Sequence, residues 1–335
     1  MIGGRLKKIK GACMASGNHQ LEFERPLADL EAQIAELDAQ DDSTDGIVEK
    51  RRELRRELTD LRKKIYSELT PWETVRVARH PGRPLTTDYI NLAFDEFVEL
   101  HGDRFFGDDR AMLAGFAKLD QFKVMLIGHQ KGKTLEERQA CYFGCAHPEG
   151  YRKAMKKMEL AAKYNLPVIC LIDTPGAYPG VGAEERGQAQ VIAESMFEMS
   201  RLKTPIICVV IGEGGSGGAL GIGVGDRVAI LEYSYYSVIS PEGCAGILWK
   251  SAEHAEKAAQ ALKLTSRHLR ELGAVDDVIE EPLGGAHRDH HQMAARLKLY
   301  LIKVLEQLSE QPLDELVAAR YEKFRRLGVY LEGAQ

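Results

Sequence analysis

Seven residues at 212–218, Gly-Glu-Gly-Gly-Ser-Gly-Gly, carry the strongest chemical signal in the sequence. They follow the apolar run Pro205-Ile-Ile-Cys-Val-Val-Ile211, typical of a buried strand, and lead into an expected helix at 217–224. Glycine N–H groups at such a junction have no intrahelical acceptor, and the positive end of the helix dipole lies behind them. The pattern therefore predicts a site for negative charge, either fixed on a phosphate or developing on an oxygen during a reaction.

The residues alone leave several interpretations of this segment open. Gly212, Gly214 and Gly217 match a dinucleotide-binding fingerprint, with Glu232 about 20 residues farther on. That fingerprint should open a βαβ unit, whereas a long α/β-like sequence precedes it here, so a nicotinamide oxidoreductase is disfavoured. The adjacent amides of Gly217 and Gly218 would instead form an oxyanion hole that needs no reacting side chain. A tight turn whose glycines serve packing alone is the interpretation without a ligand.

The same segment contains the Gly-x-Ser-x-Gly pattern of a nucleophile elbow, centred on Ser216. A serine hydrolase needs an acid and then a histidine downstream, and Asp276 or Glu280 followed by His287 supplies that order. A chain of this length offers such a pair by chance. The hydrolase remains an alternative function, with Ser216 as its nucleophile.

A second glycine-rich segment, at 174–182, follows the buried run Val168-Ile-Cys-Leu-Ile-Asp173. In a parallel sheet both glycine segments lie at the same carboxyl edge, where ligands bind. Asp173 is placed like the acid of a Walker-B strand, but the chain has no matching P-loop, so we expect this side chain to hydrogen-bond within the loop. Tyr178 would flank a ligand or anchor the surface. The candidate ligand-binding residues are Gly176, Ala177, Tyr178, Pro179, Gly180, Gly214, Gly215 and Ser216.

Composition and charge narrow the classes of function. The 335 residues are 44% hydrophobic and 28% charged, which is ordinary for a globular protein. A net charge of −5 gives no electrostatic basis for binding nucleic acid or an anionic membrane. The sequence shows neither a membrane-spanning stretch nor the apolar segment of a secretory signal. Six scattered cysteines predict reduced thiols in a cytoplasm, and neither they nor His287, His290 and His291 have the spacing of a metal site.

The elements that position these segments alternate along the chain. Apolar spacing predicts an antiparallel pair of helices at about 27–37 and 48–65, joined by a polar turn at 41–46 and packed on a partner or on the main body. Strand-like and helix-like runs then alternate, which is typical of an α/β domain with parallel pairing. The expected strands are 124–129, 168–173, 206–211, 228–231 and 275–280, and the expected helices are 149–164, 184–201, 217–224, 251–262 and 291–308.

Six longer motifs follow one another over most of the chain. They are His129–Gly132, Pro148–Lys153, Asp173–Gln188, Val210–Leu220, Tyr236–Cys244 and Pro282–Arg288. Together they resemble the carboxyltransferase α subunit of the bacterial-type acetyl-CoA carboxylase. The resemblance implies an α/β fold of the ClpP/crotonase type, a spiral of ββα turns with an N-terminal α-helical hairpin. We expect a disordered leader at 1–20, the hairpin and extension at 21–84, the carboxyltransferase domain at 85–322 and a tail at 323–335, with Met1 or Met14 as the start.

The resemblance also implies a reaction. The family moves a carboxyl group from carboxybiotin, held on the biotin carboxyl carrier protein, to acetyl-CoA, which gives malonyl-CoA for fatty acid biosynthesis. By resemblance, Gly217 and Gly218 supply the catalytic oxyanion-hole amides, and this chain needs no metal. A non-catalytic scaffold subunit is a second alternative.

The implied partners are a zinc-ribbon-bearing carboxyltransferase β subunit in an α2β2 heterotetramer, the carrier protein, and a separate biotin carboxylase that uses ATP. Two features depart from the family pattern. The leader at 1–20 is extra, and Tyr142-Phe-Gly-Cys145 replaces the usual Asn-Phe-Gly-Met. The second departure falls in a loop that we expect near CoA or biotin.

Overall fold

The computed structural model describes residues 20–40 and 46–328. The predicted leader, apart from Gln20, and both possible start residues lie outside this part of the chain. So do most of the predicted turn at 41–46 and the end of the predicted tail.

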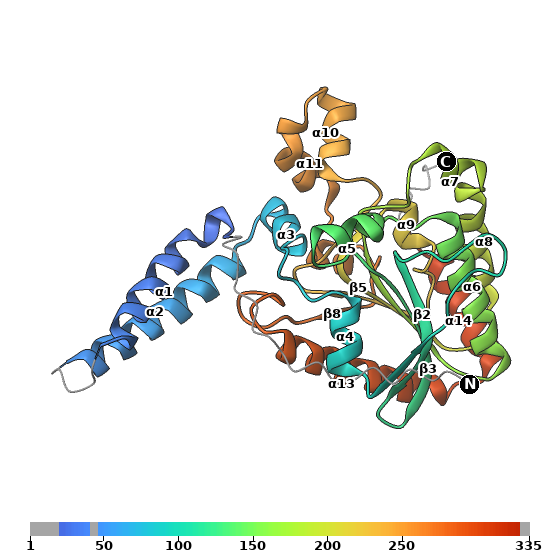
Figure 1. Cartoon of the computed structure of the whole chain (residues 1–335), viewed down its shortest axis with the longest axis horizontal. Helices are drawn as coiled ribbons and strands as arrows, with labels where there is room; N and C mark the ends of the chain where they lie inside the picture. Colours follow the sequence, from blue (N-terminus) through green and yellow to red (C-terminus); the bar gives the residue numbers. More distant parts are fainter. Residues whose placement is uncertain (1–19, 41–45, 329–335) are drawn as a thin grey trace, which may run out of the picture.

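An eight-stranded mixed sheet forms the centre of the molecule, with the strand order β1-β2-β3-β4-β5-β6-β8 (Figure 1). The first three strands are antiparallel, and the strands from β3 to β8 pair in parallel. β7 lies off this path and pairs with β5. The strands are β1 (Glu96–Glu99), β2 (Met112–Leu119), β3 (Phe122–His129), β4 (Val168–Thr174), β5 (Ile206–Gly215), β6 (Arg227–Leu231), β7 (Tyr235–Ser237) and β8 (Asp277–Ile279).

β5 has two successive partners on one of its edges. Its first half pairs with β6, and its last three residues, 213–215, pair with β7. The prediction that this strand ends at residue 211 was therefore wrong, because the glycines continue the strand. They do so because the neighbours approach closely: a Cβ at Gly212 would lie 2.5 Å from the Asp173 carboxylate, and one at Gly214 would lie 2.8 Å from the Tyr236 ring.

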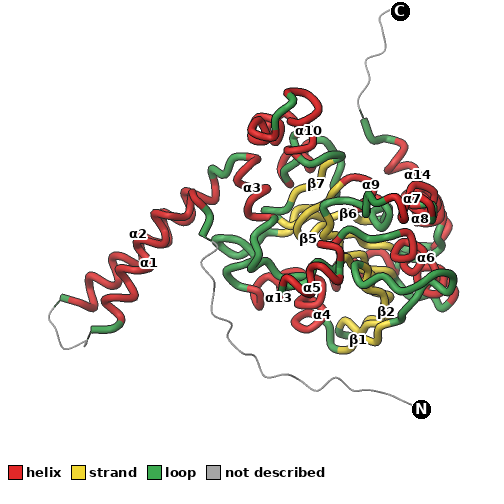
Figure 2. Tube along the Cα trace, turned by 45° about the horizontal axis from the view of Figure 1, so that its top comes forward, coloured by secondary structure: helices red, strands yellow, loops and turns green. Residues whose placement is uncertain are grey.

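Helices cover both faces of the sheet (Figures 1 and 2). On one face α6 and α8 bury Tyr151 and Met199, and on the other α4 and α13 bury Tyr89 and Leu297. No helix within residues 20–40 and 46–328 is long and apolar enough to cross a membrane. The α-helices are α1 (Arg25–Asp38), α2 (Ile47–Ser67), α3 (Pro71–Ala78), α4 (Thr86–Ala93), α5 (Leu135–Ala140), α6 (Pro148–Lys163), α7 (Val181–Glu185), α8 (Gln188–Arg201), α9 (Ser216–Leu220), α10 (Pro241–Trp249), α11 (Ala255–Leu262), α12 (Ser266–Glu271), α13 (His290–Ser309) and α14 (Leu313–Arg325).

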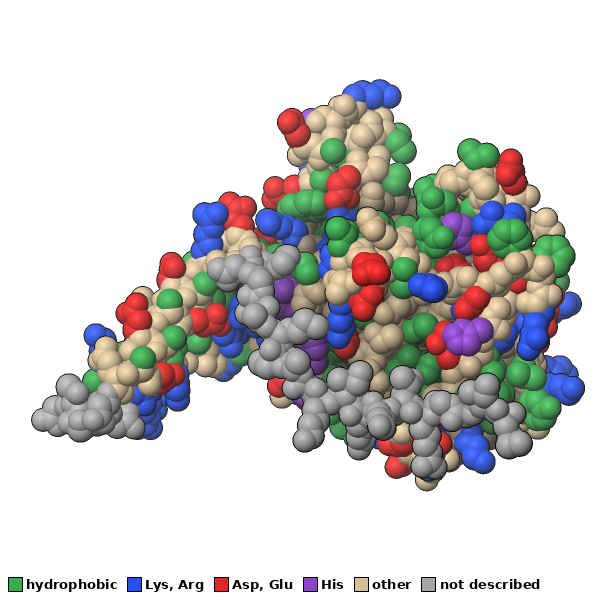
Figure 3. Space-filling model, viewed as in Figure 1, with side chains coloured by type: hydrophobic (Ala, Val, Ile, Leu, Met, Phe, Trp, Pro, Cys, Tyr) green, Lys and Arg blue, Asp and Glu red, His purple; other side chains and the backbone are tan. Residues whose placement is uncertain are grey.

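The predicted pair of N-terminal helices, α1 and α2, projects from the body as a hairpin (Figure 2). Ion pairs join the two helices, including one of 2.7 Å between Arg62 and Glu31, and charged side chains of both signs lie along the visible surface of the hairpin (Figure 3). At its base, Tyr66 packs edge-on against Tyr233 of the body, with ring centroids 5.3 Å apart. Only the base of the hairpin therefore packs on the main body, one of the two predicted possibilities, and packing of the rest on a partner stays a prediction.

Most predicted elements are present with shifted ends. The helix expected at 184–201 is divided into α7 and α8 because Gly187, at φ 80°, interrupts it. The helix expected at 217–224 is much shorter, since α9 ends at Leu220. Several elements were not predicted, because short or glycine-interrupted apolar runs give a weak periodic signal. They are strands β1, β2 and β7 and helices α3, α4, α5, α10, α12 and α14.

Candidate active site

Gly217 and Gly218 occupy the first turn of α9, directly after the end of β5. The first N–H groups of a helix have no intrahelical acceptor, and no described residue accepts a hydrogen bond from either glycine amide. Gly217 is partly exposed, and Gly218 is buried. With only five residues, α9 adds little dipole behind these amides, so the predicted contribution of the helix dipole was too large. The two N–H groups themselves are the donors that the site offers.

The two glycine-rich segments lie in direct contact, as their common place at the carboxyl edge of the sheet predicts. A Cβ at Gly218 would stand 2.5 Å from the Ala177 nitrogen, and one at Gly215 would stand 2.1 Å from the Pro175 oxygen. Real side chains do not fit at such distances, so glycine is required at both positions. A Cβ at Gly217 would meet nothing closer than Ile192 at 3.8 Å, so this position has room.

The other predicted loop residues lie beside this contact. Gly176 has φ 155°, near the limit of the left-handed region, and its backbone N–H donates a hydrogen bond to Thr174 Oγ1 at 3.1 Å. The Tyr178 ring lies over Gly180, where an added Cβ would be 2.4 Å from the ring. Pro179 is exposed. The loop is thus fixed by its own backbone and by the Tyr178 ring.

A cluster of charged side chains lies beneath the glycine segments. Lys131 Nζ donates to Asp173 Oδ1 at 2.7 Å and to Glu213 Oε2 at 2.5 Å. Glu213 also accepts hydrogen bonds from Arg79 Nε at 2.6 Å and from the Tyr235 hydroxyl at 2.7 Å. Asp173 accepts the Glu213 N–H at 2.9 Å, so its partner lies on β5 rather than within the 174–182 loop where the hydrogen bond was predicted.

The electrostatics of this cluster leave no spare positive charge. Burial alone would lower the pKa of Lys131, but the Asp173 and Glu213 carboxylates outweigh burial and raise it. Burial likewise opposes ionisation of Glu213, yet Lys131 and Arg79 lower the pKa of that carboxyl to about 2. Both cations are thus charged and bonded to carboxylates. A ligand anion at the glycines meets neutral amides rather than a free cation.

Sequence reasoning missed Arg79, Lys131 and Glu213 as parts of this arrangement. The available signal was Glu213, a lone acid within a strand of apolar residues and glycine, because a buried carboxylate needs a partner. Next to the cluster, burial and the Lys131 cation lower the pKa of His129 to about 3, against an opposing effect of the Gly218 carbonyl. His129 is therefore a neutral, buried neighbour of the glycine turn.

The residues of the possible hydrolase triad are not brought together. Ser216 has φ 49° and is exposed, as an elbow nucleophile would be, but its hydroxyl bonds to no described residue. Asp276 pairs with Lys323 at 2.8 Å, and the His287 ring stacks on His80 with centroids 4.1 Å apart. No described contact links His287 to Ser216, so the structure gives this serine no general base.

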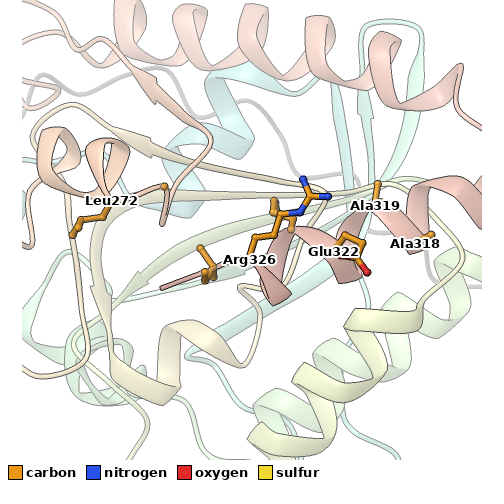
Figure 4. Close-up of a pocket in the computed structure, with 8 residues that line it drawn as sticks. Leu272, Ala318, Ala319, Glu322 and Arg326 are labelled. Carbon is orange, nitrogen blue, oxygen red and sulfur yellow. The ribbon is translucent and has the colours of Figure 1, made fainter. Parts of the chain in front are cut away.

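A cleft lies elsewhere, between α14 and the residues that follow α12 (Figure 4). Its volume is about 620 Å³. Its one lysine, Lys323, already donates to Asp276 and to two backbone carbonyls. In the described part of the chain, no group of three or more His, Cys, Asp or Glu side chains could hold a metal ion. The lining residues are Leu272, Gly273, Ala318, Ala319, Glu322, Lys323, Arg326 and Leu327.

Comparisons with known sequences agree over nearly the whole chain. Residues 20–328 match the family described as "Acetyl co-enzyme A carboxylase carboxyltransferase-like". The acetyl-coenzyme A carboxylase carboxyl transferase subunit alpha of Rhodopirellula baltica is 72% identical over 93% of this chain and 98% of that protein. The protein of the same name from Methylococcus capsulatus is 55% identical over 94% of this chain and 98% of that protein.

Solved structures show the same fold at low sequence identity. Transcarboxylase 12S aligns with a TM-score of 0.57 and 20% identity, over 69% of this chain and 42% of that one. The β subunit of geranyl-CoA carboxylase from P. aeruginosa aligns with a TM-score of 0.53 and 19% identity, over 73% of this chain and 46% of that one. The predicted α/β fold of the crotonase type is confirmed.

Proposed function

Since this chain belongs to the family of acetyl-CoA carboxylase carboxyltransferase α subunits, we propose that Gly217 and Gly218 form the oxyanion hole of a biotin-dependent carboxyltransferase. In this reaction the carboxyl group passes from carboxybiotin to acetyl-CoA and gives malonyl-CoA. The observation that carries the proposal is the pair of adjacent glycine amides without an acceptor among the described residues. Carboxybiotin, when bound, supplies the carboxyl group, and its ureido oxygen is left with negative charge.

The residues present fit such a group. Gly217 and Gly218 donate two neutral N–H groups to the charged oxygen, and the contact of Gly215 and Gly218 with the 175–177 backbone fixes their direction. Fixed donors of this kind need no reorganisation as charge develops, and removal of one typically costs about 10²- to 10³-fold in kcat. No side-chain base is needed on this chain if the ureido group itself takes the proton from acetyl-CoA.

The remaining parts of the reaction fall to partners. We infer a zinc-ribbon-bearing β subunit that contributes donors for the thioester oxygen, in an α2β2 assembly whose site lies at the α–β boundary. The carboxyl group arrives on the biotin carboxyl carrier protein, and a separate biotin carboxylase uses ATP to load it. The designation of the relatives as α subunits supports a multi-subunit enzyme. The free thiols of the described cysteines support a cytoplasmic location.

The test is removal of one amide donor in the complex with the β subunit. Proline at position 217 deletes the N–H in a first helical turn, where proline is tolerated. Because proline restricts the residue before it and Ser216 has φ 49°, both variants are made in a Ser216→Gly background. The assay is malonyl-CoA-dependent carboxylation of free biotin.

We expect Gly217→Pro to lower kcat by about 10²-fold or more relative to Gly217→Ala, whose Cβ has room and whose amide is retained. Assembly with the β subunit and an unchanged Tm verify that both variants are folded. Equal turnover of the two variants would favour the scaffold alternative and refute the oxyanion hole.

A further inference from the structure

Residues 142–144 form the most strained segment near the proposed site. Tyr142 has φ 47°, Phe143 φ 56° and Gly144 φ 87°. Two consecutive non-glycine residues in the left-handed region are unusual, and such strain persists only where the surroundings enforce it. Strained backbone of this kind is concentrated at functional sites.

The segment is fixed by the loop that contacts the oxyanion-hole glycines. Thr174 Oγ1 donates to the Gly144 carbonyl at 2.7 Å, and the Tyr178 N–H donates to the Ala146 carbonyl at 3.0 Å. Gly144 packs against Lys131, whose Cγ would lie 2.7 Å from an added Cβ. The strained segment, the 174–178 loop and the charged cluster are therefore held together as one unit.

This unit presents three aromatic rings in mutual contact. His147 lies parallel to Tyr178 with ring centroids 4.0 Å apart, and Tyr142 meets His147 edge-on at 4.1 Å. Tyr142 is also 5.4 Å from Tyr178. Burial lowers the pKa of His147, which favours the neutral form of the ring. Tyr142 is nevertheless 42% exposed. This is unexpected, because its strained backbone is not compensated by full burial of the ring.

We propose that Tyr142 and Tyr178 form an aromatic ledge that packs against the ring of the ureido group whose oxygen the Gly217 and Gly218 amides hold. The inference rests on the proposed function. The ledge adjoins those amides because the residue before Tyr178, Ala177, is in backbone contact with Gly218. A flat, uncharged ring gains most from an aromatic face, and the cations of the underlying cluster are already paired.

The residue type at 142 supports a role in binding. Asparagine adopts the left-handed region with less strain than tyrosine. Tyrosine therefore sacrifices some stability here and adds an exposed ring. A residue serving the fold alone would not show that combination.

The test compares Tyr142→Asn with Tyr142→Phe in the assembled complex. Tyr164→Asn is the control, since Tyr164 is another exposed tyrosine (60%, against 42% for Tyr142) and lies at the C-terminal end of α6. We expect Tyr142→Asn to raise KM for free biotin about 3- to 10-fold, the size of one ring contact, with KM for malonyl-CoA unchanged and Tm equal or higher. Tyr142→Phe, which keeps the ring, should raise KM for free biotin less than Tyr142→Asn does, and Tyr164→Asn should match the wild type.

A binding measurement accompanies the kinetics. Saturation-transfer NMR with free biotin should show weaker transfer to the biotin ring protons in Tyr142→Asn than in the wild type. An unchanged KM for biotin with unchanged transfer overturns the ledge, as does a shift in KM for malonyl-CoA instead. Tyr142→Ser serves as a second ring deletion if Tyr142→Asn assembles poorly. Absence of turnover in the wild-type complex would refute the proposed function itself, which is a different outcome.

Discussion

His129 is a buried histidine whose neutrality affects stability. Burial, followed by the Lys131 cation, lowers its pKa to about 3, whereas an unfolded histidine titrates near 6.5. Between these values the unfolded chain binds a proton that the folded chain does not, so this residue's contribution to stability is lost as pH falls from about 6.5 toward 3. The expected slope is about 1.4 kcal/mol per pH unit.

Replacing this histidine should reduce that dependence. We expect His129→Phe to flatten the fall in the free energy of unfolding below pH 6.5 by about one proton, measured by urea unfolding at several pH values. His291→Gln, a change at an exposed histidine, is the control and should leave the slope as in the wild type. Asp109, whose pKa is raised to about 6 mainly by burial, acts in the opposite direction but equally in all three proteins. Identical slopes for His129→Phe and the wild type would contradict a neutral buried ring.

Ser216 is the residue that distinguishes a hydrolase from a carboxyltransferase. Its hydroxyl is exposed, as that of a nucleophile would be, but no described contact links it to His287 as a general base. Loss of a true nucleophile costs on the order of 10⁶-fold in kcat, whereas we expect Ser216→Ala to cost less than about tenfold. The wild-type complex should also remain unlabelled by a fluorophosphonate. Stoichiometric labelling of Ser216 would restore the hydrolase alternative.

Among the elements, the ends of β4 and β5 determine the position of the glycine turn. A Cβ at Gly215 would stand 2.1 Å from the Pro175 oxygen, so Gly215→Ala has to push the two segments apart. We expect a loss of about 1–3 kcal/mol in the free energy of unfolding, together with reduced turnover.

The matched change is Gly246→Ala in α10, where an added Cβ meets nothing within 4 Å. Alanine in a helix should raise stability there by about 0.5–1 kcal/mol. Thermal unfolding of both variants gives the comparison. Equal effects of the two substitutions would show that the contact between the 175–177 backbone and Gly215 is loose.

The sequence allowed the arrangement of elements to be predicted better than the side chains around the site. The adjacency of the 174–182 and 212–218 segments followed from parallel strands, whose carboxyl ends share one edge of the sheet. The ion cluster could not be predicted in the same way, because Lys131 and Arg79 reach Glu213 across 82 and 134 residues of sequence. Local patterns carry no information on such pairs. The length of β5 was missed because glycine is normally unfavourable in strands.

At the scale of the whole molecule, α14 packs on the body through two buried side chains, Leu316 and Arg320. Arg320 of α14 donates to both Asp226 oxygens, at 2.8 and 2.7 Å, and to the carbonyls of Met199, Leu202 and Thr204. Removing one partner of a buried pair leaves the other charge uncompensated. We expect Arg320→Met to lower the free energy of unfolding by about 3–5 kcal/mol.

Arg325→Met on the same helix is the control, since Arg325 is exposed and lies over the Tyr321 ring. Its expected effect is below about 1 kcal/mol. Urea unfolding of the two variants measures the difference. Similar losses would show that α14 is anchored by its apolar face, through residues such as Leu316, rather than by Arg320.

The base of the N-terminal hairpin has a practical consequence. The Tyr66 ring packs against Tyr233. The Glu24 carboxylate accepts hydrogen bonds from the Tyr66 hydroxyl and from Arg288 of the body. A shortened protein that begins after Leu69 would therefore expose the Tyr233 ring and leave Arg288 without the Glu24 carboxylate. Anyone preparing a minimal catalytic fragment would have to redesign that exposed wall before expecting a soluble product.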